Sequence, residues 1–321
     1  MDGLQSFYSI MKDHTPSTFI GLPSTDIDHL EGVRVAVMAA CEASPSSPMV
    51  ASHSANAPAA IRKASATFAG RLAHFDFDLG ATMFPNEGDF RGMVDLGDIK
   101  TNVADAPGNR KQIENTVRRV LSAGAVPIVL GGDDSVPIPV LAAYEDHGPI
   151  HILQIDAHVD WADVVGGNAY GYGSPMRRAS EYPWVKGMLQ VGMRGLGSGV
   201  VAQHEDAKKW GSKLVTSYEL HKLGVEQVCQ SIPMGARCFI SLDCDGIDPS
   251  VFPAVNGPAP GGLSYEDVIE LIKGVADRAS IAGMALVEFV PESDGPTKLS
   301  ALTAARIAAV TMGLIARQQS C

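Results

Sequence analysis

The chain has 321 residues and a formal net charge of -11, with 25 Lys and Arg against 36 Asp and Glu. This length is enough to bury a large core, and the acidic balance argues against nucleic acid as a partner while it is compatible with attraction of a small cation. Five cysteines without paired metal-ligand spacing are typical of reduced thiols, and no segment predicts a signal peptide or a membrane span. We therefore expect a cytoplasmic protein that does not bind a membrane.

The first 30 residues mix polar, Pro and Gly residues without periodicity. They predict an N-terminal arm, 1–30, that lies on the surface or on a neighbouring subunit, ahead of one domain over 31–321. Residues 33–38 are rich in β-branched side chains and predict the first strand. The Ser-, Pro- and Ala-rich stretch 42–58 predicts a loop, and Pro58 then opens a helix.

Predicted strands and helices alternate through the rest of the chain. The strands are apolar along their whole length, which is typical of a parallel sheet with both faces covered. The sequence therefore predicts an α/β fold, a single three-layer α/β/α domain with a mainly parallel sheet. The predicted strands are 94–98, 126–130, 150–154, 188–193, 239–242 and 284–290; the predicted helices are 109–123, 137–144, 200–210, 264–276 and 299–315, with another ending at 225–231.

Three candidate metal ligands follow the strand at 150–154. Asp156, His158 and Asp160 alternate, so in an extended strand end they would project from one face. Two carboxylates and one imidazole aimed at one point would repel one another and resist desolvation unless a cation neutralised them. The spacing therefore indicates a metal site.

The strand at 239–242 repeats the pattern, because Asp243 and Asp245 follow it. Ligand sites of parallel sheets lie beyond the carboxyl ends of the strands, so both groups face one pocket, together with residues 131–135 and with Glu288. Such a set suits two divalent ions bridged by shared carboxylates, which can activate a water molecule. Asp residues can instead cap loops, but two such clusters in one chain favour the metal site.

With these motifs assembled, the chain resembles the ureohydrolase family of arginases and agmatinases, from about Ala57 to the closing helix. Pro260–Gly–Gly–Leu263 and the segment 174–179 are most similar to the agmatinase-like branch. The resemblance is carried by Gly-Gly-Asp at 131–133, Asp-Ala-His-Val-Asp at 156–160, and the segments 241–249, 257–263 and 287–291.

The resemblance implies an arginase-like fold and a metal-dependent hydrolase of C–N bonds in linear amidines, which releases urea and an amine from a small cationic guanidino compound, agmatine-like or a substituted guanidine. It implies two divalent ions per chain, Mn²⁺ with Ni²⁺ as the alternative, and a homo-oligomer (trimer or hexamer). Glu288 is implied to bind the guanidinium, and Asp160 to ligate metal and to relay the proton to the leaving amine. The implied metal ligands are Asp156, His158, Asp160, Asp243 and Asp245.

Two positions depart from the family pattern. Asp134 stands where most members have a metal-binding histidine; aspartate is also an ordinary ligand for manganese, so we expect Asp134 to bind metal. Tyr172 stands where many members have a histidine, and it either contacts substrate or packs its loop. Trp161 forms either an apolar wall over the guanidinium or part of the core.

These departures leave two alternative functions open. The first is hydrolysis of a biguanide such as a metformin-like substrate. The second is a degenerate or supporting subunit in a mixed oligomer with a homologous, active subunit. Metal content separates the supporting subunit from the enzymes, and urea release from a substrate panel separates the enzymes from each other.

Overall fold

The apolar segments become the strands of one sheet in the computed structural model, which describes residues 17–45, 47, 49–85 and 87–318. Within these residues the sheet has eight strands in the order β4-β1-β5-β10-β9-β6-β7-β8, and every pairing is parallel. The predicted fold class is confirmed. The strands are β1 (Val35–Ala40), β4 (Met93–Asp98), β5 (Val126–Gly131), β6 (Ile150–Ile155), β7 (Val185–Met193), β8 (Lys213–Thr216), β9 (Ala236–Asp243) and β10 (Ala279–Val287).

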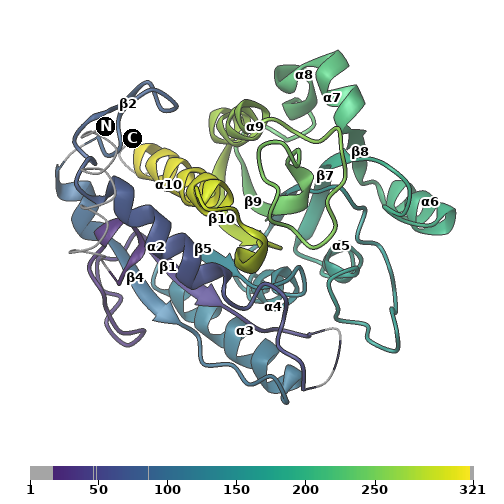
Figure 1. Cartoon of the computed structure of the whole chain (residues 1–321), viewed down its shortest axis with the longest axis horizontal. Helices are drawn as coiled ribbons and strands as arrows, with labels where there is room; N and C mark the ends of the chain where they lie inside the picture. The colour runs from purple at the N-terminus through teal and green to yellow at the C-terminus, as the bar shows by residue number, and fades with distance from the viewer. Residues whose placement is uncertain (1–16, 46, 48, 86, 319–321) are drawn as a thin grey trace.

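Helices cover both faces of this sheet because successive strand residues point to opposite sides. Val35 and Val37 of β1 pack with α2, α9 and α10, whereas Ala36 and Met38 pack with α3 and α4. Figure 1 shows α10 lying between α2 and α9. The helices are α2 (Ala57–Ala69), α3 (Ala106–Ser122), α4 (Pro137–Ala142), α5 (Pro175–Ala179), α6 (Val201–Trp210), α7 (Ser217–Leu223), α8 (Val225–Cys229), α9 (Tyr265–Arg278) and α10 (Leu299–Gln318).

Helix α10 is long and apolar enough to match a membrane span in length and composition, with a mean hydropathy of 1.7. This finding corrects the expectation that no segment of the chain resembles a membrane span. In the structure 78% of this window is buried inside the protein, as in the central helix of a globular core. Arg306 on α10 is paired with Asp76 and Asp78 in the loop that carries the short strands β2 (Phe75–Asp76) and β3 (Ala81–Thr82).

The predicted arm lies partly outside the described residues, which begin at residue 17. Its described part lies only partly on the surface: residues 23, 24, 26, 28 and 29 are exposed, whereas Phe19, Ile20 and Leu22 are buried in the core beside α2. The backbone N–H of Phe19 donates to Asp95 of β4 at 2.7 Å. Apolar side chains therefore tie this segment to the domain, and the boundary at residue 30 stays a prediction.

Helix and strand ends, and the shortest elements, differ in how well the sequence predicts them. Ser264 caps α9 as its sequence indicated, because its hydroxyl accepts from the Asp267 N–H at 3.0 Å. Strand β8 and helices α5 and α7 were not predicted, since segments of four to seven residues carry too little periodicity. Strand β10 begins five residues before the predicted 284, because Ala279 and Ser280 pair with β9 despite their small side chains.

Candidate metal centre

Two predicted ligand groups lie at the ends of neighbouring strands. β6 and β9 pair in parallel with Ile155 opposite Leu242, so Asp156 and Asp243 leave the sheet side by side. The loop after β9 passes against Asp156: a Cβ on Gly246 would lie 2.7 Å from the Asp156 nitrogen, so only glycine fits. The sheet register and this close contact bring the two acidic loops together.

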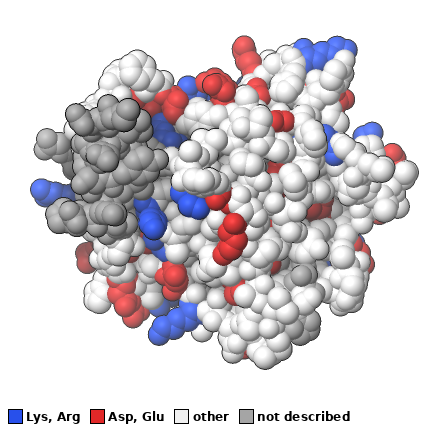
Figure 2. All heavy atoms as spheres, viewed as in Figure 1, with Lys and Arg blue, Asp and Glu red and all other residues white. Residues whose placement is uncertain are grey.

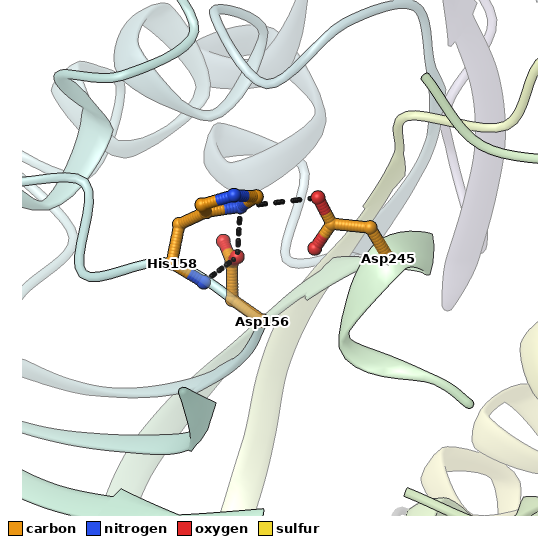
Figure 3. A group of neighbouring side chains, drawn as sticks. All are labelled: Asp156, His158 and Asp245. Carbon is orange, nitrogen blue, oxygen red and sulfur yellow. Dashed lines mark hydrogen bonds and ion pairs between the residues drawn. The ribbon is translucent and has the colours of Figure 1, made fainter. Parts of the chain in front are cut away.

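The first group of ligands is Asp156, His158 and Asp245 (Figure 3). His158 Nδ1 lies 3.1 Å from Asp245 Oδ2 and 3.3 Å from Asp156 Oδ1. The Asp156 carboxylate also accepts the backbone N–H of His158 at 2.6 Å, which closes a turn directly after β6. An imidazole and two carboxylates therefore point at one another, as a metal triad requires.

This turn corrects one expectation about local structure. β6 ends at Ile155, and Asp160 has a φ of 47°, so residues 156–160 do not continue as an extended strand. The short carboxylate of Asp156 bonds the backbone two residues ahead and turns the chain out of the sheet. The predicted side chains still converge on one cavity, but a loop brings them there.

The second group of ligands is Asp134, Asp156 and Asp243, whose ligand atoms lie within 4.8 Å of one another. All three side chains are buried. Asp134 Oδ2 is buried without a hydrogen-bond partner among the described residues, which is costly for a carboxylate unless a cation meets it. Asp156 belongs to both groups, so it is placed to bridge two ions.

Burial and mutual repulsion set the electrostatics of this cluster. Burial, followed by the charge of Asp160, raises the pKa of Asp134 well above its usual range. Burial and Asp245 do the same for the pKa values of Asp156 and Asp243. These carboxyl groups therefore hold protons more tightly than ordinary aspartates when no metal is bound.

The pKa values of His158 and Asp245 shift in the directions opposite to those that burial alone would produce. The hydrogen bond to Asp245 raises the pKa of His158 to about 9. Burial, the largest single influence, raises the pKa of Asp245, but the hydrogen bond from His158, its charge and the Ala157 N–H together leave the pKa lowered. The two side chains form an ion pair in the metal-free chain, and a metal ion would displace its proton.

Two glutamine side chains form a hydrogen-bonded chain that ends on the carboxylates of Asp156 and Asp160. Gln154 Nε2 donates to Asp156 at 2.7 Å and to Asp160 at 2.6 Å. Gln154 in turn accepts from Gln190 at 2.5 Å, and Gln190 accepts from the Ser212 hydroxyl at 2.6 Å. Sequence reasoning missed this relay, although Gln154 and Gln190 are polar residues at the same register of two buried strands.

Glu288, the predicted guanidinium-binding residue, lies directly after β10 with a φ of 65°. Its Oε1 accepts the backbone N–H of Asp134 at 2.9 Å. Its Oε2 lies 2.5 Å from His53 Nε2, a contact that sequence reasoning missed because His53 lies in the aperiodic loop 42–58. The hydrogen bond with Glu288 raises the pKa of His53. Glu288 is thus held by two donors.

All the predicted site residues except Asp156 border one cavity of about 330 Å³. Glu288 and most of the acidic side chains form part of its lining. Trp161 also borders it, although the ring is buried and packs edge-on against Trp210 at 6.0 Å. Tyr172 borders the cavity, is 40% exposed, and lies 6.3 Å from the His53 ring in edge contact. Both aromatic residues therefore pack against a neighbouring ring and also line the cavity.

Other acidic and basic residues have structural roles. Asp133 accepts from the Ser135 N–H at 3.1 Å, a hydrogen bond within its own loop. Asp248 fixes its loop through the N–H groups of Gly261 and Gly262 at 2.8 and 2.9 Å. Arg194, which sequence reasoning missed, donates to Asp245 O at 2.7 Å and to neighbouring carbonyls, so it fixes the loop that carries Asp245.

Comparison with known proteins assigns the family. The model of the arginase family matches residues 48–313. The chain belongs to the arginase family. It is 31% identical to the mitochondrial arginase 1 of Arabidopsis thaliana over 68% of this chain and 65% of the relative, so the match spans about two thirds of that protein. The predicted family resemblance is confirmed.

Two further relatives bear on the branch and the fold. An N(1)-aminopropylagmatine ureohydrolase of Thermus thermophilus is 32% identical over 61% of this chain and 66% of its own length, in line with the agmatinase-like branch. The structure of proclavaminate amidino hydrolase from Streptomyces clavuligerus matches with a TM-score of 0.82 and 27% identity, over 96% of this chain and 99% of that one. This arginase-family chain therefore has the fold of that structure over nearly its whole length.

The side chains present fit two divalent ions. Carboxylate oxygens and one imidazole are hard or intermediate donors that suit manganese and related ions. The unbonded oxygen of Asp134 and the double membership of Asp156 match a site with two positions. Asp160 belongs to neither group, so its part in binding metal stays a prediction. We refer to these residues as the metal cluster: Asp134, Asp156, His158, Asp160, Asp243 and Asp245.

Proposed function

We propose that this arginase-family protein is a binuclear-metal hydrolase that cleaves the guanidino group of a small cationic guanidino compound to urea and an amine. The observation that carries the proposal is the pair of ligand groups that share Asp156 and border one cavity with Glu288. A guanidinium needs a carboxylate that faces it, and Glu288 offers one whose two oxygens are each held by a hydrogen bond, from the Asp134 N–H and from His53.

The chemistry divides between the ions and the side chains. Two divalent ions, manganese or nickel, would be held by the metal cluster and would lower the pKa of a water molecule toward neutrality. Glu288 orients the planar guanidinium by a charge-assisted contact. Water adds to the guanidino carbon, the bond from that carbon to the substituted nitrogen breaks, and Asp160 delivers the proton of the water to that nitrogen. The products are urea and the free amine.

Asp134 supports an enzyme more than an inert partner. A carboxylate that pointed away from the cluster would have found a hydrogen-bond donor, whereas Asp134 Oδ2 remains unbonded and buried among the described residues. Burial, followed by the charges of Asp160 and Asp156, raises its pKa, as expected for a buried group close to other carboxylates. We therefore include Asp134 as the sixth ligand. Assembly into a homo-oligomer and a cytoplasmic location accompany the proposal as predictions.

The test measures urea release by manganese-reconstituted protein from a panel of guanidino compounds, beside Glu288→Gln. We expect Glu288→Gln to lower kcat/KM by about a hundredfold or more with metal content intact, because loss of a buried charge partner costs several kcal/mol. Glu292→Gln is the matched control: Glu292 is exposed after the same strand and accepts from Asn56 at 2.6 Å. Fully metallated wild type that releases urea from no compound would overturn the proposal.

A further inference from the structure

The cavity has a charged floor and an uncharged wall. Its ionisable lining groups are Glu288 and the metal cluster without Asp156, all of which the proposed chemistry uses at the guanidino end. Among the residues described, no Lys, Arg or further Asp or Glu borders the cavity. The remaining lining consists of glycines and of Trp161, Ala162, Val165, Tyr172, Ser198, Gln203 and Asn256.

Charged side chains next to the wall are already paired. Asp163 follows Ala162 in the chain, but it is bonded to Arg178, whose side chain is only 11% exposed. On the opposite loop, His204 and Glu205 follow Gln203 and lie 3.3 Å from each other. Neither loop therefore presents a spare charge to the part of the cavity that the substituent of a guanidine would occupy.

A hydrogen-bonded turn positions Val165, one of the apolar side chains of the uncharged wall. Val165 and Asn168 exchange backbone hydrogen bonds at 3.0 and 2.9 Å across Gly166 and Gly167, whose φ values are 58° and 83°. Two consecutive positive φ angles are the conformation in which glycine is needed, so the turn fixes Val165 beside the cavity. The Val165 side chain lines the cavity and is 47% exposed, and with Trp161 and Ala162 it gives the lining its apolar side chains.

We propose that the substrate of this site is a guanidine with an uncharged, apolar substituent, an N-alkylguanidine, and carries no second charged end. This inference rests on the proposed hydrolase function and specifies its substrate class. A distal ammonium or carboxylate would lose water against this wall without gaining a partner of opposite charge. An alkyl chain gains about fourfold in affinity for each buried methylene. A cavity of about 330 Å³ lies at the lower end of the range for ligand sites and suits a small substrate.

The test compares three compounds that differ at the far end of the chain: butylguanidine, agmatine with an ammonium, and 4-guanidinobutyrate with a carboxylate. Urea release gives kcat/KM, and isothermal titration calorimetry gives Kd, both on the manganese-reconstituted full chain. We expect butylguanidine to exceed both charged compounds by about tenfold or more in each quantity, because a desolvated, unpaired charge is penalised. Agmatine or 4-guanidinobutyrate equal to or better than butylguanidine would overturn the inference.

Variants of neighbouring valines locate the effect. Val165→Asp adds a carboxylate to the wall, and we expect the ratio of agmatine to butylguanidine to rise about fivefold while 4-guanidinobutyrate weakens, as for a partly screened charge pair. Val164→Asp is the matched control, because Val164 is 55% exposed on the same loop and does not line the cavity. An equal shift in both variants would show that the wall at Val165 does not select the substrate.

The two readouts separate the inference from the proposed function. Preferential binding of butylguanidine without urea release from any compound would overturn the hydrolase and support the substrate class. Urea release with a preference for a charged compound would support the hydrolase and overturn the substrate class. Failure of all three compounds to bind metal-loaded protein would overturn both.

Discussion

Buried carboxylates occur within strand β4 of this protein and at the carboxyl ends of strands β6 and β9, and the two sites are satisfied in different ways. In the arginine cluster, formed by Arg62, Asp95 and Asp98, the Asp95 carboxylate accepts from Arg62 Nε at 2.8 Å and Nη2 at 2.9 Å. The backbone N–H groups of Phe19 and Gly97 donate to it at 2.7 and 2.8 Å. Four donors therefore occupy one carboxylate.

The metal cluster has a single internal cation, the protonated His158 of the metal-free chain, for its five carboxylates. Its carboxylates lie against one another, with His158 as the one imidazole and Gln154 as a neutral donor. The face in Figure 2 shows acidic and basic side chains scattered among uncharged ones, so dense negative charge is a property of this buried site and not of that surface. The comparison teaches that the arginine cluster is complete within the chain, whereas the metal cluster requires cations from solution.

Asp243→Asn gives the largest expected effect. Loss of a ligand oxygen should empty at least one metal position and lower turnover by about a thousandfold or more. In chelator-treated protein the same change removes one of several repelling charges, so the free energy of unfolding should rise by about 1 kcal/mol. Urea released from substrate measures turnover, and denaturation by added urea measures the free energy of unfolding. A metal-free variant less stable than metal-free wild type would show that the charges of the cluster are compensated without metal.

Asp95→Asn applies the same chemical change to the other cluster. It leaves the buried guanidinium of Arg62 partly uncompensated, so the free energy of unfolding should fall by about 3–5 kcal/mol. Metal content per folded chain should not change. Denaturation curves and elemental analysis of the folded fraction test both points. Loss of metal without loss of stability in Asp95→Asn would contradict the view that the arginine cluster stabilises the fold without taking part in metal binding.

His53→Ala should have a moderate effect that is specific to the substrate. The variant removes one of the two donors that fix Glu288. We expect kcat/KM to fall by about tenfold, as for loss of one hydrogen bond to a charged group, with metal content unchanged. His53→Gln keeps a side-chain N–H donor and should restore part of the loss. Equal kinetics of the alanine variant and wild type would exclude a positioning role.

The smallest expected effect concerns pH and metal-free protein. The folded-state pKa of His158 is raised from 6.5 to about 9, so its ion pair with Asp245 stabilises the fold fully below pH 6.5, and this contribution is lost as pH rises through about 9. The Tm of chelator-treated protein should therefore fall by a few degrees between pH 7 and 10. His158→Asn should show a smaller fall, while His53, whose pKa is also raised, accounts for part of the remainder. An unchanged slope in His158→Asn would contradict this assignment.

The sequence predicted the parts of the site that follow regular structure. Asp156, His158, Asp243 and Asp245 could be found because each pair follows an apolar strand, and parallel strands end at one edge. His53 could not, because loop 42–58 has no periodicity and its contact with Glu288 spans 235 residues. The left-handed conformations of Asp160 and Glu288 were likewise invisible, since neither residue type signals a positive φ there.

The most direct test of the central claim is the manganese stoichiometry of wild type, Asp95→Asn and Asp243→Asn after equilibrium dialysis and elemental analysis. If the metal cluster requires outside cations and the arginine cluster does not, wild type and Asp95→Asn should each retain about two ions per folded chain, and Asp243→Asn at most about one. Wild-type protein that retains no tightly held divalent ion, or Asp243→Asn that retains as many as wild type, would contradict the account.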